Sequence, residues 1–415
     1  GLFDGGGGAG LADYWDVTRS SKVAGGGFIW AFVDETVKRP DSGRQNGGQM
    51  DTAENRAPDG VVGPYREKEG SFSAIKEIWS PVAVQRVGVE DSYEVENRYH
   101  FTNLRDCTFT WQLRNFAKPW DDKGGHEVIA QWSQPVELAP GGKKLIQVEF
   151  PDAADGADAH ALRVDDAQGR EIWTWVYGGQ GVVGGTVEPP KARGERGRRE
   201  HGQRPFGGVV RAAGGGELTK TEWRERPDGS VELEYAYTLD GVVDYHGVSF
   251  DLPDKDVKSV RWLGQGPFRV WKNRLAGTTL GVWETARNET ITGYEGWKYP
   301  EFAGCYAGVQ WMRLETTAGP VVIELDDPSL FVQVGRPKFP GEPKPFSPTT
   351  AATRRAPLSQ LAGNAWANLP EAGFSILHAI PPIGTKFQLA NTTGPQGQQN
   401  VAKGEYRGRV RFYSP

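Results

Sequence analysis

The sequence contains little cysteine and no long apolar run, and both shortages exclude classes of protein. Of its 415 residues two are cysteine, Cys107 and Cys305, and they lie far apart in the chain. Neither a disulfide framework nor a metal-ligand spacing is visible, and the pair does not decide the redox compartment. No apolar stretch approaches the roughly 18 residues that a membrane-spanning helix needs, so no membrane partner is expected.

The chain also lacks an excess of positive charge. Its formal net charge is −5, which gives no general electrostatic reason to bind nucleic acid or an anionic membrane. One stretch, residues 191–204, carries six basic residues against two glutamates. Because no aromatic residue is interleaved there to stack on bases, we interpret it as a solvated linker rather than a polyanion site. A neutral or weakly charged partner fits this composition better.

The beginning of the sequence lacks a methionine and a signal peptide. The first residue is Gly1, and no charged-then-apolar pattern follows it. We expect this start to result from cleavage, a cloning boundary or a split gene. The compartment therefore stays unknown, between bacterial cytoplasm, periplasm and secretion.

Glycine, proline and tryptophan are abundant, with 56 Gly, 28 Pro and 15 Trp. Glycine and proline that are spread along a chain indicate many turns between short strands. Tryptophan is typical of β-sandwich cores, where large rings supply much of the buried area. The alternative is sugar stacking, in which an indole covers the C–H face of a pyranose. We assign the majority of these tryptophans to cores.

Residues 1–81 are predicted to be the end of a (β/α)8 barrel. Apolar spacing over residues 10–23 predicts a helix, and the continuous apolar run 28–33 predicts a parallel strand buried on both faces. After a long polar segment, residues 72–79 place apolar side chains on one helical face. Helix, buried strand, long loop and helix form the last part of such a barrel. A single strand leaves its edges open, so this part is expected to need an upstream portion.

Short strands and turns follow from residue 82 onward. Residues 82–180 predict an immunoglobulin-like β-sandwich, residues 181–205 a linker, and residues 206–415 one large β-sandwich. The predicted fold class is therefore mainly β: a partial (β/α) barrel remnant, then an immunoglobulin-like sandwich, then a large β-supersandwich.

A glycine pattern near the start has no expected function. Gly5, Gly7 and Gly10 satisfy G-x-G-x-x-G, the pattern of dinucleotide-binding turns. Such a turn must follow a strand, and no strand precedes these glycines. No dinucleotide site is expected.

Several tracts resemble the β-galactosidase type of family 2 glycoside hydrolase. GGGFIWAFVDE at 25–35 resembles that family's last barrel strand, and residues 59–82 resemble the segment that leads into its last barrel helix. WLGQGPFRVWKNR at 262–274 resembles the W-x-G-x-G-P-x-E-x-Y-x-D-R signature of its last domain. Here Arg269, Trp271 and Asn273 replace Glu, Tyr and Asp. A tract at 299–314 also resembles the family, with departures. These tracts follow the family's order over nearly the whole chain.

The resemblance implies the C-terminal part of a retaining hydrolase of terminal β-glycosides, with β-galactosides as the first expectation. The family's nucleophilic glutamate would fall just before Gly1, and its acid/base glutamate further upstream. Retaining hydrolysis needs two carboxyl groups roughly 5–5.5 Å apart. No catalytic residue is therefore expected in this chain, and the isolated chain is expected to be inactive. Asp34 and Glu35, beside the predicted strand, are the fallback carboxylates.

The same resemblance implies a substrate-binding wall. Trp30 matches the aromatic platform beneath the terminal sugar, with a barrel-core tryptophan as the alternative. Asp59 matches a residue that contacts sugar hydroxyls or a monovalent cation, unless it only forms an Asp-Gly turn. Arg66, beside Glu67, is expected at the same mouth, unless the two pair on the surface. No cofactor is expected in this chain, whereas the parent enzyme is expected to use Mg²⁺ or Na⁺.

Two other interpretations stay open. In the first, the chain is a non-catalytic carbohydrate-binding or assembly module. In the second, it is a separately encoded small subunit that completes a barrel in trans. The expected partners are a carbohydrate, such as a terminal β-galactoside, and a missing N-terminal portion or partner chain. A homo-oligomer is compatible with each interpretation.

Overall fold

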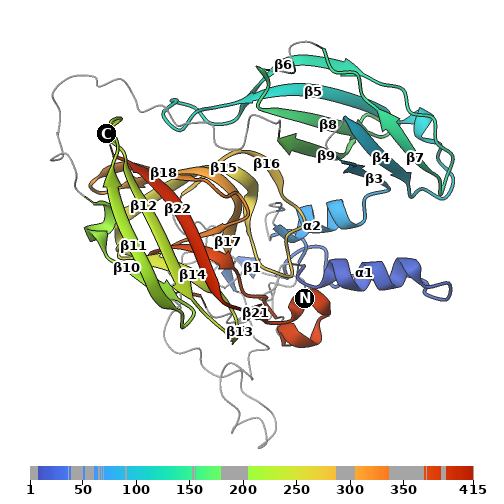
Figure 1. Ribbon diagram of the computed structural model, residues 1–415. Coiled ribbons are helices and arrows are strands. Elements are labelled where there is room, and N and C mark those ends of the chain that lie inside the picture. Colours follow the sequence, from blue (N-terminus) through green and yellow to red (C-terminus); the bar gives the residue numbers. More distant parts are fainter. Residues whose placement is uncertain are drawn as a thin grey trace, which may run out of the picture.

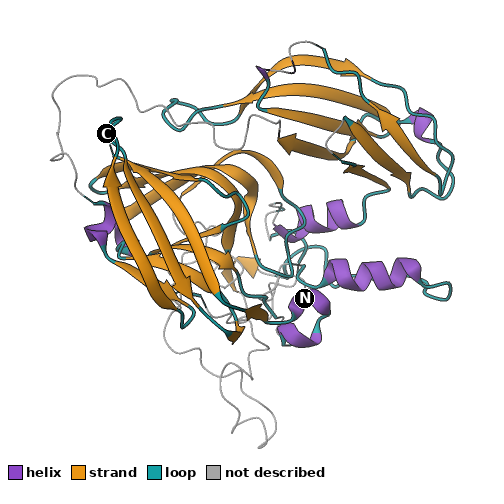
Figure 2. Ribbon diagram, in the orientation of Figure 1, coloured by secondary structure: helices purple, strands orange, loops and turns teal. Residues whose placement is uncertain are grey.

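Figure 1 shows the computed structural model of the protein. The structure describes residues 8–35, 37–38, 50–51, 60–63, 66, 68, 70–88, 91–151, 154, 156–178, 204–286, 304–335, 369–370, 372–384 and 389–414. Among these residues no helix has the length and apolar content to cross a bilayer. Strands dominate, so the predicted mainly β fold class is confirmed (Figure 2).

Both predicted helices of the N-terminal part are confirmed. They are α1 (Leu11–Ser20) and α2 (Gly70–Ile78), and the rings of Trp15 and Trp79 meet between them at 5.2 Å. In α1, Asp13 lies in the first turn and Arg19 in the last, which suits the helix dipole. A two-stranded ladder, β1 (Val37–Lys38) and β2 (Met50–Asp51), completes this part.

The predicted buried strand at 28–33 is wrong. Only Val33 forms a bridge, a parallel one with Val62, and no strand covers the run. The side chains of Phe28, Trp30 and Phe32 are 106%, 70% and 64% exposed rather than buried. A parallel strand needs hydrogen-bonding neighbours on its edges, and in the described part of the chain only residues 60–62 adjoin this segment.

Residues 82–178 form two antiparallel sheets that pack face to face. One has the order β3 (Val82–Arg86), β4 (Ser92–Asn97), β7 (Lys143–Gln147). The other has the order β6 (His126–Ser133), β5 (Thr108–Phe116), β8 (Ala159–Asp165), β9 (Glu171–Gly178). Tyr93 and Trp111, both fully buried, pack at 4.7 Å between the sheets. The core is therefore that of a sandwich.

The C-terminal part is a large sandwich built from eleven strands. They are β10 (Val210–Ala213), β11 (Glu217–Glu225), β12 (Val231–Thr238), β14 (His246–Phe250), β15 (Val257–Val270), β16 (Thr279–Ala286), β17 (Cys305–Thr316), β18 (Gly319–Leu325), β19 (Phe331–Val334), β20 (Phe374–Ala379) and β22 (Glu405–Tyr413). A small ladder, β13 (Gly241–Val243) with β21 (Asn400–Ala402), lies beside it. Short 3₁₀ turns occupy Leu104–Asp106, Pro205–Gly208, Asp254–Asp256, Ala390–Thr392 and Pro395–Gly397.

Strand β17 joins the two layers of this sandwich. One layer has the order β10, β14, β20, β19, and the other β16, β15, β17, β18, β22, β12, β11. Strand β15 pairs with β17 along its whole length, from Cys305 to Thr316. The beginning of β17 pairs with β19 through Tyr306 and Val332, and its end pairs with β18. Gly308, at φ 61°, lies between these two pairings. Four phenylalanine rings fill the core between the layers: Phe206, Phe250, Phe374 and Phe412.

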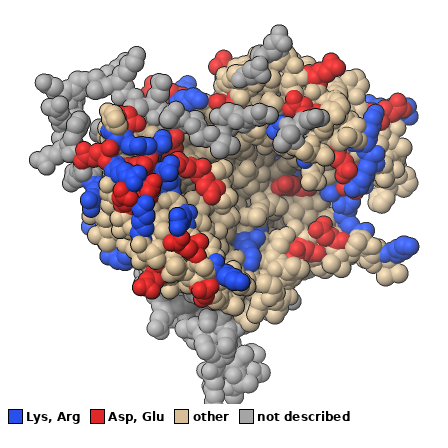
Figure 3. Space-filling model, viewed as in Figure 1, with Lys and Arg blue, Asp and Glu red and all other residues tan. Residues whose placement is uncertain are grey.

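The outer face of β11, β12 and β22 carries alternating charges (Figure 3). Lys220 and Arg224 on β11 pair with Glu234 on β12, and Arg411 on β22 pairs with the buried Glu232. These positive side chains are matched by carboxylates, so the face offers no unmatched basic surface. The exposed pairs among them, such as Lys220 with Glu234, contribute little to stability.

The two helices and both sandwiches touch one another. Arg261 and Arg313 of the large sandwich donate to the backbone oxygens of Asp121 and Pro119 in the β5–β6 connection. Lys76 of α2 lies 3.3 Å from Glu171 of β9. These contacts hold the parts as neighbours, whereas the domain boundaries predicted at 81, 180 and 205 stay a prediction.

A buried tyrosine between two histidines gives the large sandwich a pH-dependent stability. The Tyr237 hydroxyl lies 2.8 Å from His246 Nδ1 and 2.9 Å from His378 Nδ1. His378 Nε2 lies 3.1 Å from the Arg407 carbonyl and donates to it, so its Nδ1 accepts the tyrosine proton. His246 Nδ1 then donates to the tyrosine oxygen. Burial, and then the neighbouring His378, lowers the pKa of His246 to about 4.

We expect the free energy of unfolding to fall as the pH is lowered from 6.5 toward 4. In that window the unfolded chain binds a proton at His246, at the ordinary pKa of about 6.5, and the folded chain does not. The loss between pH 7 and pH 4.5 is on the order of 2–3 kcal/mol. In the variant His246→Asn the amide keeps a donor near Nδ1 but does not titrate. Urea unfolding at both pH values should show a smaller loss for this variant; equal losses would contradict the assignment.

Candidate functional site

The expected sugar platform, Trp30, lies on an exposed segment. Its side chain is 70% exposed, between the exposed rings of Phe28 and Phe32, and the peptide bond to Ala31 is cis. In this chain the indole is therefore not a core residue. We call these three exposed aromatic side chains the 28–32 surface.

A short backbone ladder holds the end of this segment against residues 60–62. Val61 N–H donates to the carbonyls of Ala31 and Phe32, and Asp34 N–H donates to Val62. Ser71 of α2 donates its hydroxyl to Val61 at 3.0 Å. The segment that carries Trp30 is thus tied to the helix through residues 60–62.

The fallback carboxylate Asp34 takes part in the same ladder. It is only 4% exposed, and its Oδ1 accepts the backbone N–H of Gly60 at 2.7 Å. A Cβ on Gly60 would lie 2.3 Å from the Asp34 nitrogen, so glycine is required for this approach. A carboxylate that attacks a sugar must be accessible to it, and Asp34 is buried. Its geometry is that of a residue that positions the chain; Glu35 is exposed, with no role that its position indicates.

The remaining predicted site residues are not all brought together. Arg66 is exposed, with a left-handed φ of 70°, and its N–H donates to Gly63 at 2.9 Å. It follows residues 60–63 and so lies in the same stretch of chain as Gly60. Asp59 and Glu67 lie outside the described residues. Their roles stay predictions.

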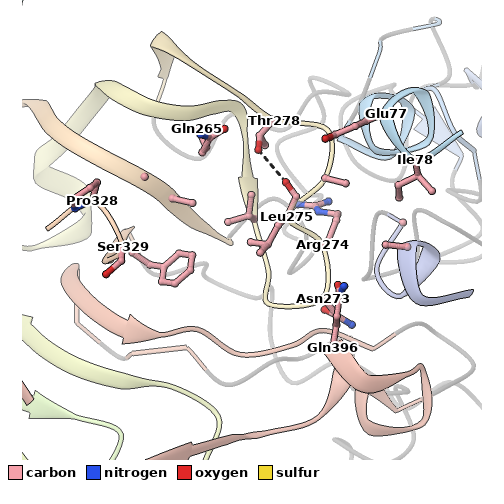
Figure 4. Close-up of a pocket in the computed structure, with 17 residues that line it drawn as sticks. Glu77, Ile78, Gln265, Asn273, Arg274, Leu275, Thr278, Pro328, Ser329 and Gln396 are labelled. Carbon is pink, nitrogen blue, oxygen red and sulfur yellow. Dashed lines mark hydrogen bonds between the residues drawn. The ribbon is translucent and has the colours of Figure 1, made fainter. Parts of the chain in front are cut away.

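A cavity of about 550 Å³ lies where the large sandwich meets the two helices (Figure 4). Its wall combines the beginning of α1, the end of α2, the segment around 265–278 and the segment 328–331. The lining residues are Gly8, Ala12, Glu77, Ile78, Gln265, Val270, Asn273, Arg274, Leu275, Ala276, Thr278, Ala307, Gly308, Pro328, Ser329, Phe331 and Gln396.

Glu77 connects α2 to the large sandwich at this cavity. One of its carboxylate oxygens accepts the backbone N–H of Gly277. Burial raises the pKa of Glu77, and the hydrogen bond from Gly277 opposes that rise. On α1, Gly10 N–H donates to the Asn273 carbonyl at 2.9 Å, and Asp13 accepts the N–H of Gln396 at 2.9 Å.

Arg269, Trp271 and Asn273, which depart from the signature of the resembling family, make structural contacts in tract 262–274. Asn273 is 1% exposed; its amide donates to the Ile383 carbonyl at 2.8 Å and accepts the Ile383 N–H at 2.9 Å. Trp271 is fully buried, and the Arg269 carbonyl accepts from the Arg274 guanidinium. These side-chain contacts hold tract 262–274 within the C-terminal part, and the Asn273 carbonyl that accepts from Gly10 links it to the beginning of α1.

The described residues contain no group of three or more His, Cys, Asp or Glu side chains that could hold a metal ion. Asp59, the candidate for a monovalent cation, is not among them, so the expected Mg²⁺ or Na⁺ of the parent enzyme stays a prediction. Cys107 and Cys305 are free thiols, and burial raises the pKa of Cys305 to about 12. Such a protonated, buried thiol is unreactive.

Neither Glu77 nor the cavity could be identified from sequence patterns. A single glutamate near the end of an amphipathic helix is usually solvated, and only the approach of Gly277 identifies it. Gln265 stands inside the tract 262–274, between two glycines. The two flanking glycines could have identified Gln265 from the sequence, because glycines permit close approach of another segment.

Two protein-family models match the chain. The model for domain 4 of β-galactosidase matches residues 93–177, and the model for the β-galactosidase small chain matches residues 197–378. A search of curated proteins finds no match.

Solved structures of one enzyme are also similar to the chain. Exo-chitosanase CsxA of Amycolatopsis orientalis has 12% identity to it, with a TM-score of 0.18; the similarity covers 64% of this chain and 29% of that one. A complex of this enzyme with PNP-β-D-glucosamine has 11% identity, with the same coverage and TM-score. The chain thus spans 29% of the length of these structures.

Proposed function

We propose a function from one premise: this chain contains domains of the β-galactosidase type of glycoside hydrolase family 2. It is the C-terminal part of a retaining glycoside hydrolase that acts on terminal β-glycosides, with β-galactosides as the first substrates to test. The two catalytic glutamates belong to a portion of the enzyme outside this chain. This chain contributes one wall of the sugar site and two sandwiches that support it.

The order of the two family matches carries the proposal. The domain 4 match at 93–177 comes before the small-chain match at 197–378, as the resemblance of the tracts implied. The helices that precede both matches are in contact with both sandwiches, through Lys76 with Glu171 and through Glu77 with Gly277. The segment that carries Trp30 therefore has a fixed place beside them.

The 28–32 surface supports a barrel portion as the missing partner. Its three aromatic side chains are more than half exposed on a segment with one parallel bridge. Several large apolar side chains exposed on one short segment favour an interaction site there. Strands of the remaining barrel would supply the backbone partners and the apolar cover that residues 28–33 do not find in the described part of the chain.

In the assembled site the chain's own residues bind and orient the sugar. Trp30 provides an apolar indole face for the C–H groups of the terminal pyranose. Asp34 holds the following backbone to Gly60, and Arg66 and Asp59 are the polar candidates in the adjoining stretch. Two carboxyl groups roughly 5–5.5 Å apart then perform double displacement at the anomeric carbon. Asp59 is also the candidate oxygen ligand if the parent enzyme binds Na⁺ or Mg²⁺.

The chain alone is expected not to hydrolyse aryl β-galactosides. Asp34 is buried within its ladder, and the proposal places both glutamates elsewhere. Release of nitrophenol from p-nitrophenyl β-galactoside measures this directly, with the double variant Asp34→Asn/Glu35→Gln as the control. Turnover that survives repurification and disappears in the control would overturn the proposal.

The exposed 28–32 surface also favours a second arrangement, a small subunit that completes a barrel in trans. The single-polypeptide and two-chain arrangements differ in which experiment restores hydrolysis. Activity that appears only when the chain is fused to an upstream barrel portion supports a single polypeptide. Activity restored by mixing separately expressed parts supports the two-chain enzyme. If galactose binds and neither experiment restores hydrolysis, the chain is a carbohydrate-binding module instead.

A further inference from the structure

The cavity beside Glu77 has the dimensions of a small-molecule site. Its volume of about 550 Å³ lies within the range of known ligand pockets. It is formed by segments far apart in the sequence, since α2, the 265–278 segment and the 328–331 segment each supply one side (Figure 4). It shares no lining residue with the 28–32 surface, so it is a different place from the expected sugar platform.

Several polar groups of this cavity have no protein partner in the part of the chain that the structure describes. The side chains of the half-buried Gln265 and of the exposed Ser329 and Gln396 make no hydrogen bond there, although the backbone N–H groups of Ser329 and Gln396 do. Glu77 uses one carboxylate oxygen for Gly277, which leaves the other. Two amides and a hydroxyl can both donate to and accept from a ligand, and the carboxyl oxygen can accept.

The rest of the lining is apolar. Leu275 is 48% exposed, and Ile78 and Phe331 also line the cavity. Such apolar side chains offer contact area to the C–H groups of a ligand. Amide, hydroxyl and carboxyl groups around an apolar patch match a molecule that has both hydroxyl groups and apolar C–H faces.

The charges of the lining argue against an anion. Among the lining residues that the structure describes, Arg274 is the single cation; it is 7% exposed, and its guanidinium donates to the Arg269 carbonyl. A phosphate or sulfate ligand needs cationic or N–H donors directed at it. The raised pKa of Glu77 means that this carboxyl group is more easily neutral than an ordinary glutamate, which favours an uncharged ligand.

From this lining we propose that the cavity is a second, non-catalytic site for a neutral sugar of mono- or disaccharide size. The inference does not depend on the proposed function, because none of its residues is assigned to hydrolysis. A sugar bound here would contact α2, the 265–278 segment and the 328–331 segment together. It would therefore stabilise the attachment of the helices to the large sandwich as well as the fold itself.

The test uses the full chain carrying Trp30→Ala, so that binding at the 28–32 surface does not contribute. Galactose and lactose are titrated by calorimetry, with inorganic phosphate as the third probe. We expect saturable binding of at least one sugar and none of phosphate. Ser329→Trp, which places an indole in the cavity from an exposed position, should abolish the binding, and Gln396→Ala should weaken it at least tenfold.

Three results would overturn the proposal. The first is no saturable binding of either sugar by the Trp30→Ala chain. The second is binding that Ser329→Trp leaves unchanged, with a melting temperature that shows the variant is folded. The third is phosphate binding that the cavity variant removes. The proposed hydrolase function is judged by turnover of the assembled enzyme, so failure of one does not imply failure of the other.

Discussion

Trp30→Ala in the assembled hydrolase is expected to lower kcat and kcat/KM together. The indole lies on an exposed segment, where it can cover a sugar, and its negative π face attracts the positive charge that develops at an oxocarbenium-like transition state. A desolvated cation–π contact is worth about 2 kcal/mol, which corresponds to a rate loss of roughly thirtyfold. An interaction made mainly in the transition state affects kcat, whereas loss of uniform binding raises KM alone.

Kinetics and thermal unfolding of the same variant distinguish a platform from a core residue. A buried tryptophan changed to alanine costs on the order of 3–5 kcal/mol of stability. Trp30 is 70% exposed in this chain, so we expect a much smaller loss. Phe28→Ala is the matched control, because it removes an exposed aromatic ring from the same segment. Normal kinetics with a lowered melting temperature would rule out the platform.

Gly277→Ala is expected to loosen or break the attachment of α2 to the large sandwich. Gly277 has φ +89°, and a Cβ there would lie 2.5 Å from the Ala74 nitrogen and 2.8 Å from the Ser73 carbonyl carbon. These neighbours are backbone of α2 and cannot rotate away. The left-handed conformation costs alanine about 1–2 kcal/mol, and the clash raises the total to on the order of 3 kcal/mol or more. The hydrogen bond from Gly277 to Glu77 is lost if the segment shifts.

Gly215→Ala isolates the conformational part of that cost. Gly215 also has φ +89°, but no atom lies within 4 Å of the position that a Cβ would take there. It should lose only about 1–2 kcal/mol in urea unfolding. Hydrogen exchange of the α2 amides gives the second readout, since protection of α2 should fall in Gly277→Ala and not in Gly215→Ala. Equal losses in the two variants would mean that the approach of Gly277 to α2 does not matter.

The helices and the mainly β character could be predicted from the sequence because they depend on local patterns. Apolar residues at helical spacing defined α1 and α2, and turn residues separated the short strands. Strand β8 has a weak strand signal in its sequence, although it is among the most buried strands. Its sequence AHALRVD is rich in alanine, which has low strand propensity, and its place between β5 and β9 is decided by pairing across the sheet.

The error at 28–33 has the opposite cause. The apolar run has the composition of a buried parallel strand, but a strand also requires neighbours, which composition does not reveal. Strand β22 illustrates the same limit from the polar side. Its arginines at 407, 409 and 411 look like a solvated segment, yet Arg411 faces the buried Glu232 across the sheet. In both segments, the neighbouring strand or side chain decided the structure, and the composition of the segment did not.

The candidate site was predictable only in part for the same reason. Trp30 and Asp34 were singled out from a tract of the chain, and the structure adds that Asp34 holds Gly60. Glu77 was not singled out, since its importance depends on a glycine two hundred residues away in the chain. Residues that lie in one tract could be identified from the sequence. Contacts between distant tracts, such as that of Glu77 with Gly277, became visible only in the folded structure.

Strand β17 is expected to make the two layers of the large sandwich unfold together. Its first residues pair with β19 in one layer, whereas β15 along its whole length and β18 at its end pair with it in the other layer. If one layer melts, the other loses part of the strand pairing that β17 provides. The two layers are therefore thermodynamically coupled and should unfold as one cooperative unit. In the sandwich of residues 82–178 no strand that the structure describes belongs to both sheets, so side-chain packing alone couples them.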